Sequence, residues 1–157
     1  ACVNFGSYVS MREYCRQYGV NFNRLDRKSR FQEVEKLCRL LMSSIEKVIP
    51  ILPVSLVASV FVEYPDDELS AFEVEARVNR LIEKIEPRGA PIYVTTRSRG
   101  QTIVTALNML KIRRLVTENN GWYRTDPRML DVLTYYANSI AHWFDVTEIS
   151  EPQPLQG

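Results

Sequence analysis

Histidine is almost absent from this sequence: His142 is the only one in 157 residues. Cysteine is scarce too, since the chain has only Cys2, Cys15 and Cys38 and no Cys-x-x-Cys pair. Zinc centres are built mainly from cysteine and histidine ligands. We therefore predict no metal site, and no cofactor is expected. The odd cysteine count favours reduced, buried thiols in a cytosolic setting over disulfides.

The chain also lacks a strong net charge and a long apolar run. Its formal charge is +1, so no overall field favours nucleic acid or an anionic membrane. The most apolar segment, 48–62, is shorter than the roughly 20 residues that cross a bilayer, and Pro50 and Pro53 interrupt its first half. We predict a buried helix from about residue 53, with a membrane-contacting segment as the alternative.

Helix start and stop signals dominate the rest. Serines followed three residues later by Glu or Gln predict helices that begin near Ser10, Ser29 and Ser70. Another helix is expected over about 100–111. Their expected inward faces are Phe31, Val34, Leu37, Cys38, Leu41, Ile45 and Val48; Val74, Val78, Leu81, Ile82 and Ile85; and Ile103, Ala106, Leu107 and Leu110.

Strand signals are fewer. We expect short strands at 3–5 and 91–96, and a hairpin over 115–125 whose Asn120-Gly121 dipeptide suits a type I′ turn. Asn119 and Trp122 should face each other across it. Asp126 and Pro127 should begin a last helix over about 127–144.

These elements predict a mainly α fold with a small β component. From about 53 to 126 the order is helix, helix, short strand, helix and hairpin, which suits a winged-helix-like arrangement of three helices plus a hairpin, followed by a C-terminal helix. We expect a strand and helices at 1–50, the winged-helix-like domain at 51–150 and a loose polar tail at 151–157.

The only histidine lies on the last predicted helix. Asp131, Tyr135, Asn138 and His142 are spaced 4, 3 and 4 residues apart, so they should form one polar stripe, with Asn138 one turn from the His142 ring. Ser139 lies nearby, but a serine nucleophile needs an oriented base and an oxyanion hole, and no Gly-x-Ser-x-Gly occurs. We predict a structural stripe, with a ligand or interdomain contact as the alternative.

Basic residues form a second candidate site. Arg97 and Arg99 precede a helix beside Gly100, which suits a phosphate, although the P-loop spacing and lysine are missing. A solvated loop is the favoured interpretation. The basic residues of a nucleic-acid-binding helix and wing would be Arg97, Arg99, Lys111, Arg113, Arg114 and Arg124. Acidic neighbours weaken that interpretation, so a stand-alone winged-helix nucleic-acid binder is the rival hypothesis.

Three segments resemble the glycerol-3-phosphate acyltransferases. VNFGSYVSMREY, 3–14, is similar to the Val-Asn-Phe-Gly strand and Leu-x-x-Tyr helix that follow the family's last acyltransferase motif. ILPVSLVASVFVE, 51–63, resembles its Pro-Val-x-Leu-Val-Ala helix. LTYYANSIAHWF, 133–144, resembles its Leu-x-Tyr-Tyr-x-Asn-x-x-x-His signature, with Ala137 where members often carry Arg. The segments follow the family's order, cover most of 3–144 and have the compact spacing of bacterial members.

The resemblance implies the C-terminal region of a bacterial membrane-associated enzyme. That family transfers a fatty acyl group from acyl-CoA or acyl-carrier protein to glycerol 3-phosphate, the first step of phospholipid synthesis. Its general base is the His of a His-x4-Asp motif, whereas Thr147 stands where His142 would need that Asp. The Arg-Ser-Arg run at 97–99 resembles the family's phosphate-binding motif, but it lies after the Val-Asn-Phe-Gly segment instead of before it.

The resemblance therefore implies a region without catalytic or substrate-binding residues, inactive as an isolated chain. The parent is expected at the cytoplasmic side of the bacterial inner membrane, and the fragment itself is expected to be soluble. We expect a docking or regulatory role. Segments 48–62 and 143–149 and the stripe Asp131, Tyr135, Asn138 and His142 would contact the missing upstream acyltransferase domain or the membrane surface.

Overall fold

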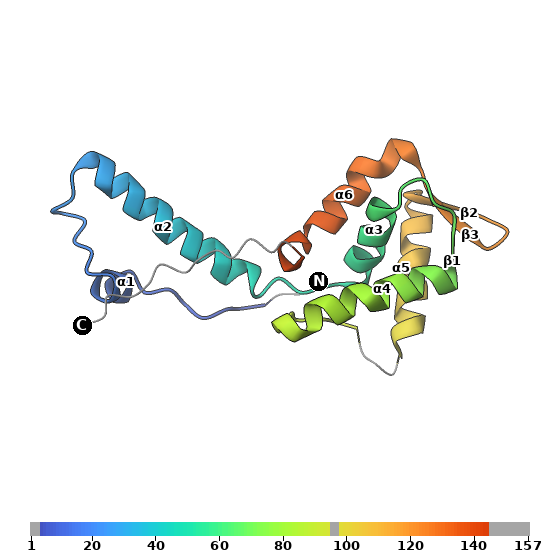
Figure 1. Cartoon of the computed structure of the whole chain (residues 1–157), viewed down its shortest axis with the longest axis horizontal. Helices are drawn as coiled ribbons and strands as arrows, with labels where there is room; N and C mark the ends of the chain where they lie inside the picture. Colours follow the sequence, from blue (N-terminus) through green and yellow to red (C-terminus); the bar gives the residue numbers. More distant parts are fainter. Residues whose placement is uncertain (1–3, 95–97, 145–157) are drawn as a thin grey trace. The chain divides into compact units, whose positions relative to one another are not determined.

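The computed structural model describes residues 4–94 and 98–144, and helices dominate this part (Figure 1). The helices are α1 (Met11–Gln17), α2 (Arg27–Glu46), α3 (Pro53–Glu63), α4 (Ala71–Ile85), α5 (Arg99–Ile112) and α6 (Leu130–Asn138). The strands are β1 (Leu69–Ser70), β2 (Val116–Asn119) and β3 (Trp122–Thr125). The predicted mainly α fold with a small β component is confirmed. None of the helices in the described ranges is long and apolar enough to cross a membrane.

The described residues fall into two units, which we call unit 1 (4–48) and unit 2 (49–94 and 98–144). In unit 1, α1 begins as predicted: the Ser10 hydroxyl accepts a hydrogen bond from the Glu13 amide at 3.4 Å. The predicted start of α2 at Ser29 is wrong. The Asp26 carboxylate caps this helix by accepting bonds from the Lys28 and Ser29 amides, both at 3.2 Å. Aspartate is among the strongest N-caps, so Ser29 lies inside the first turn instead.

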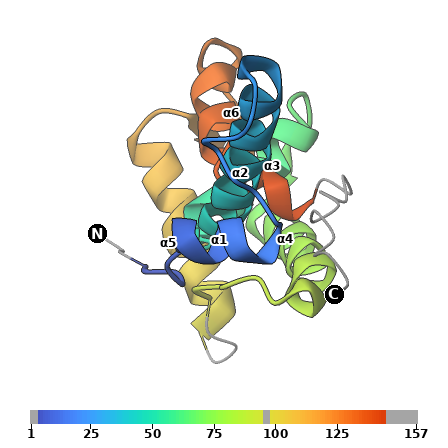
Figure 2. The ribbon, with the colours of Figure 1, turned by 90° about the vertical axis from the view of Figure 1, so that its left-hand side faces the viewer.

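Unit 1 has almost no core of its own. Tyr14 is the one buried apolar residue among 4–48, and α2 buries none of its 20 residues. The Tyr14 hydroxyl donates to Glu33 Oε2 at 3.3 Å and so links α1 to α2. The two helices run in different directions. Figure 1 shows α1 end-on and α2 lengthwise, and Figure 2 shows α1 lengthwise.

This exposed helix corrects the prediction of buried thiols. Cys38 is exposed and Cys15 is only half-buried, and both are free. The physical reason is that Cys38 lies on the apolar face of α2, which the described residues of unit 1 do not cover. Cys2 lies outside the described residues.

Neither of the two short predicted strands forms among the described residues. Asn4 and Phe5 have irregular backbone, no described strand pairs with them, and Val3 lies outside the described residues. The segment predicted at 91–96 contributes only a single parallel bridge, between Ile51 and Ile92. Its last two residues lie outside the described residues.

Unit 2 contains the hydrophobic core. The predicted inward residues of α4 (Val74, Val78, Leu81, Ile82 and Ile85) and of α5 (Ile103, Ala106, Leu107 and Leu110) are all buried. The capping box that begins α4 is present, since the Ser70 hydroxyl accepts from the Glu73 amide and the Glu73 carboxylate accepts from the Ser70 amide at 2.8 Å.

Helix α3 has the predicted start at Pro53 and lies inside this core. Five of its residues, Leu56, Val57, Ala58, Val60 and Phe61, are fully buried by the rest of unit 2. The apolar character of α3, which makes up most of segment 48–62, is thus explained by packing within unit 2. These buried side chains are not available to a docking partner.

The hairpin is confirmed in detail. Asn120 and Gly121 have φ angles of 51° and 84°, as a type I′ turn requires, and Asn119 is paired with Trp122. β1, which the sequence did not reveal, pairs with the other edge of β3 and gives the antiparallel order β1-β3-β2. The observed order is therefore α3, β1, α4, α5, β2, β3.

The predicted continuous helix over 127–144 is wrong. Asp126 provides the expected cap, but it caps a 3₁₀ turn at Pro127–Met129, and α6 follows only over Leu130–Asn138. A second 3₁₀ turn covers Ala141–Trp143. Ile140 lies between α6 and this second turn and is fully buried. Its backbone leaves helical geometry, at φ −123° and ψ 5°. Burying this side chain in the core accompanies the break in the helix.

Candidate functional site

The predicted polar stripe is divided by the break in the last helix. Asp131, Tyr135 and Asn138 are exposed residues of α6, and Tyr135 keeps 77% of its surface accessible. His142 lies in the following 3₁₀ turn, half-buried, with its ring centre 5.4 Å from that of Trp143. Helical spacing does not extend from Asn138 to His142, so the prediction of one continuous helical stripe is wrong for His142.

Ser139 joins α6 to α3. Its hydroxyl donates to the Tyr136 carbonyl at 2.7 Å and lies 2.9 Å from the Ser55 hydroxyl. A serine has one hydroxyl hydrogen, so Ser55 is the donor of the bond between the two serines. These bonds give Ser139 a structural contact across the helix pair. That the chain holds no Ser/His catalytic pair stays a prediction.

The N-terminal end of α5 faces a carboxylate. A Cβ atom added to Gly100 would lie 2.8 Å from Glu75 Oε1, so the Glu75 side chain of α4 packs directly against this helix end. A negative charge is favourable there because it interacts with the helix dipole. It also repels a phosphate, which supports the solvated-loop interpretation over an anion site. Arg99 is half-buried, and Arg97 lies outside the described residues.

Two of the candidate nucleic-acid contacts are engaged within unit 2. Lys111 of α5 pairs with Glu118 of β2 at 2.9 Å. This hydrogen bond raises the pKa of the Lys111 ammonium and lowers the pKa of the Glu118 carboxyl. Arg113 donates to the Tyr136 hydroxyl. Arg114 and Arg124 are exposed. The structure therefore uses part of the basic set to hold α5 against its neighbours.

No metal centre is evident in the part of the chain that the structure describes. Among residues 4–94 and 98–144, no three His, Cys, Asp or Glu side chains gather in a way that would hold an ion.

One exposed apolar surface was not expected from the sequence. Of the residues of α2 predicted to point inward, Phe31, Val34, Cys38, Leu41 and Ile45 are exposed, and Leu37 is half-buried. Val48, predicted on the same face, lies just after the helix and is half-buried, and Met42, which was not part of that prediction, is exposed as well. Near the start of the helix an open hollow is lined by Arg27, Arg30, Phe31 and Val34. The signal was in the sequence as an apolar pattern, but the pattern does not say which protein part covers it.

The comparisons with known proteins give one match. The family model of the glycerol-3-phosphate acyltransferase C-terminal region matches residues 1–146, which includes both units. Comparison with curated proteins and with solved structures gave no match.

Proposed function

The chain belongs to the C-terminal region family of the glycerol-3-phosphate acyltransferases, and we propose that it is a noncatalytic region that docks onto the acyltransferase domain of its parent. Family membership implies a parent acyltransferase with an upstream catalytic domain. The observation that carries the proposal is the match over residues 1–146. On this proposal the parent uses acyl-CoA or acyl-carrier protein as donor, and works at the cytoplasmic face of the bacterial inner membrane.

The absence of catalysis in the chain itself is supported by the surroundings of His142. A general base must come within hydrogen-bond reach of the acceptor hydroxyl and be held there. His142 is half-buried beside Trp143, and it has no Asp at the spacing that the family's His-x4-Asp motif requires. The Ser139 hydroxyl is already bonded to Tyr136 and Ser55.

Docking is supported by the two faces of α6. Leu133 and Ala137 are buried on one face, while Asp131, Tyr135 and Asn138 are exposed on the other. Tyrosine is enriched at protein interfaces because it combines apolar area with a polar tip. We propose that these three exposed residues contact the catalytic domain, with His142 at the edge of the contact.

A winged-helix-like scaffold is part of the same proposal. The order α3, β1, α4, α5, β2, β3, with β1 paired to the outer edge of β3, supports it. On this proposal the scaffold serves protein contact. The engagement of Lys111 and Arg113 with neighbouring side chains supports this over nucleic-acid binding.

Two assays test the proposal. Acyl transfer to glycerol 3-phosphate is measured for the chain alone and for the parent; we expect activity only in the parent, and transfer by the chain alone would overturn the proposal. In the parent, Tyr135→Ala should lower activity several-fold without lowering thermal stability. Trp122→Ala, which removes another exposed aromatic residue from the hairpin, is the matched control and should leave activity unchanged.

Nucleic-acid binding, the rival function, has its own test. A true binder loses affinity steeply as salt rises, because each phosphate contact releases counterions. We expect weak binding of duplex DNA by the chain, with little dependence on salt. A steep log–log slope would instead favour the rival.

A further inference from the structure

The turn that carries His142 is tied to the end of α4. Arg88 Nη1 donates a hydrogen bond to the Trp143 carbonyl at 2.6 Å, across 55 positions of sequence. Arg88 ends the 3₁₀ turn Glu86–Arg88, which continues α4, and Trp143 ends the 3₁₀ turn Ala141–Trp143. Both turns belong to unit 2. The bond therefore joins the turn that carries His142 to a distant segment of the same unit.

The break after α6 leaves this turn without helical support. Ile140 departs from helical geometry, so the regular hydrogen bonds of α6 end before His142. Inside the turn, the Trp143 amide donates to the Ile140 carbonyl at 3.1 Å, and the Phe144 amide donates to the Ala141 carbonyl at 2.8 Å. These bonds join residues within the turn, so they set its shape but not its direction relative to α4. Contacts with other elements must therefore orient His142.

Two kinds of contact hold the turn against the rest of unit 2. The first is apolar: Trp143 and Phe144 pack against the hydrophobic core, and the indole nitrogen of Trp143 is buried. The second is the bond from Arg88. Carbonyl groups at the end of a helical turn lack partners within it, and a cationic donor makes a stronger bond there than a neutral one. Arg88 therefore fixes the backbone of the turn, whereas the aromatic rings fix its apolar side.

The backbone of Arg88 is itself held in place. Ile85, just before the turn, is fully buried in the core, and Pro87 has a fixed φ angle. Gly89, the next residue, adopts a left-handed φ of 74°, and its amide donates to the Glu86 carbonyl at 3.1 Å. Glycine adopts this conformation readily because it has no Cβ atom. The Arg88 side chain thus starts from a defined position on both sides.

We infer that Arg88 is a positioning residue that orients the turn carrying His142, and so shapes the edge of the docking surface proposed on α6. It acts through the Trp143 carbonyl and not by contact with the catalytic domain. The inference rests on the proposed docking function and adds a requirement that α6 alone does not supply. If the bond were only a surface contact, loss of Arg88 would leave the surroundings of His142 unchanged, because the aromatic rings would hold the turn.

The single histidine supplies the test. Since the chain has no other, the imidazole of His142 gives the only histidine signals in NMR spectra of the chain. Its centre lies 5.4 Å from that of the Trp143 ring, and an aromatic ring shifts the signals of nearby protons. Arg88→Ala should therefore move the signals of both rings, because the turn loses its backbone anchor. Arg88→Lys keeps a cationic donor and should restore them in part. Unchanged signals in Arg88→Ala would overturn the inference.

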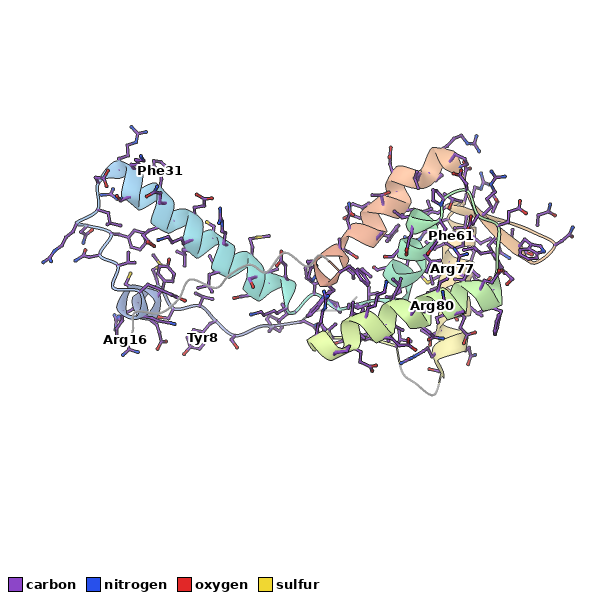
Figure 3. The ribbon with its side chains drawn as sticks, viewed as in Figure 1. Tyr8, Arg16, Phe31, Phe61, Arg77 and Arg80 are labelled. Carbon is purple, nitrogen blue, oxygen red and sulfur yellow. The ribbon has the colours of Figure 1, made fainter. Side chains whose placement is uncertain are left out.

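Further variants separate the hydrogen bond from other effects of the substitution. Arg80→Ala removes another exposed arginine, from α4 (Figure 3), and should leave the His142 signals where they are. Arg88→Met keeps a long apolar side chain and removes the donors, so it should act as Arg88→Ala does, and it serves as the test if Arg88→Ala does not fold. No shift in Arg88→Met, or an equal shift in Arg80→Ala, would overturn the inference.

Acyl transfer by the parent, measured below the temperature at which each variant unfolds, tests the consequence for function. Arg88→Ala should lower activity several-fold, Arg88→Lys should recover part of it, and Arg80→Ala should leave it unchanged. If the His142 signals move but Arg88→Ala keeps full activity while Tyr135→Ala lowers it, the inference fails and the proposed docking survives. If the chain alone transfers acyl groups, the proposed function fails whatever the His142 signals show.

Discussion

Helices α2 and α4 have similar sequence patterns and opposite surroundings. Each begins with a well-formed cap, Asp26 for α2 and Ser70 for α4, and each has one apolar face. The five inward residues predicted for α4 are 0–8% exposed, whereas the large apolar residues Phe31, Val34, Leu41, Met42 and Ile45 of α2 are 39–65% exposed. Periodicity specifies which face of a helix is to be covered. Whether neighbouring residues also supply the cover is a separate property: the described residues of unit 2 cover α4, and residues 4–48 do not cover α2.

The largest expected effect comes from removing one phenylalanine from each unit. Phe61 is fully buried in α3 and Phe31 is exposed on α2 (Figure 3). In urea unfolding of the chain, Phe61→Ala should cost about 3–5 kcal/mol, because it leaves a cavity. Phe31→Ala should change stability by less than about 0.5 kcal/mol, as surface changes do. Similar losses of unfolding free energy for both variants would show that the chain buries Phe31 by itself, and would contradict the difference between α2 and α4.

The next effect concerns the one buried apolar residue of unit 1. Burial, followed by the nearby charge and hydrogen bond of Glu33, raises the pKa of Tyr14 from 10.0 to about 12. Since the folded pKa is raised, the stabilisation is fully present below pH 10 and is lost as the pH rises through about 12. Ultraviolet titration should show a tyrosinate forming near pH 12 that Tyr14→Phe removes. If no such species forms, α1 and α2 are not held together in the chain.

A smaller effect is expected at the contact between α3 and α6. Ser139→Ala removes the acceptor of the buried Ser55 hydroxyl and should cost about 1–2 kcal/mol of unfolding free energy. Ser59→Ala is the control: its hydroxyl bonds the Ser55 carbonyl one turn back, and its loss should be close to neutral. The parent that carries Ser139→Ala should retain acyl transfer under conditions where it is folded. Loss of acyl transfer in a folded Ser139→Ala parent would contradict the structural role and indicate that Ser139 takes part in the reaction.

The smallest effect is on the pH dependence of the unfolding free energy, which should differ between the caps of α2 and α4. Hydrogen bonds from the Ser70 amide and hydroxyl lower the pKa of Glu73 below its ordinary 4.5, and bonds from Ser29 lower the pKa of Asp26 below 3.8. A lowered pKa stabilises the folded state above the ordinary value, and this stabilisation is lost as the pH falls through the lowered one. Glu73→Gln should therefore flatten the acid unfolding profile just below pH 4.5. Asp26→Asn should leave the acid unfolding of unit 2 unchanged. A change in the unfolding of unit 2 in this variant would show that the two units unfold together.

Local signals predicted unit 2 well. The capping box at Ser70, Pro53 at the start of α3 and the Asn120-Gly121 turn each act within a few residues, so the sequence contains all that these features need. Strand β1 was missed because its two residues exist as a strand only through pairing with β3, more than 50 positions later. The end of α6 was missed for the same reason, since Ile140 turns toward a core that other elements build.

The candidate site was predicted in part. Asp131, Tyr135 and Asn138 share the exposed side of α6 because their spacing is helical, whereas His142 lies beyond the point where helical spacing applies. For α2 the sequence located the apolar side, but inward burial was assumed from the pattern alone. No signal within the helix distinguishes a face covered by its own unit from a face covered by another domain.

The hydrogen bond from the Asn4 side-chain amide to the Val48 carbonyl, at 2.9 Å, has a consequence for engineering. It holds Asn4 beside Val48, the residue after which the chain passes into unit 2, 44 positions later. Adjacent ends are the property that lets a segment be inserted into, or removed from, a host protein with little disturbance. Residues 4–48 are thus exchangeable in principle, because a short linker from residue 4 to residue 48 would span the gap that their removal leaves.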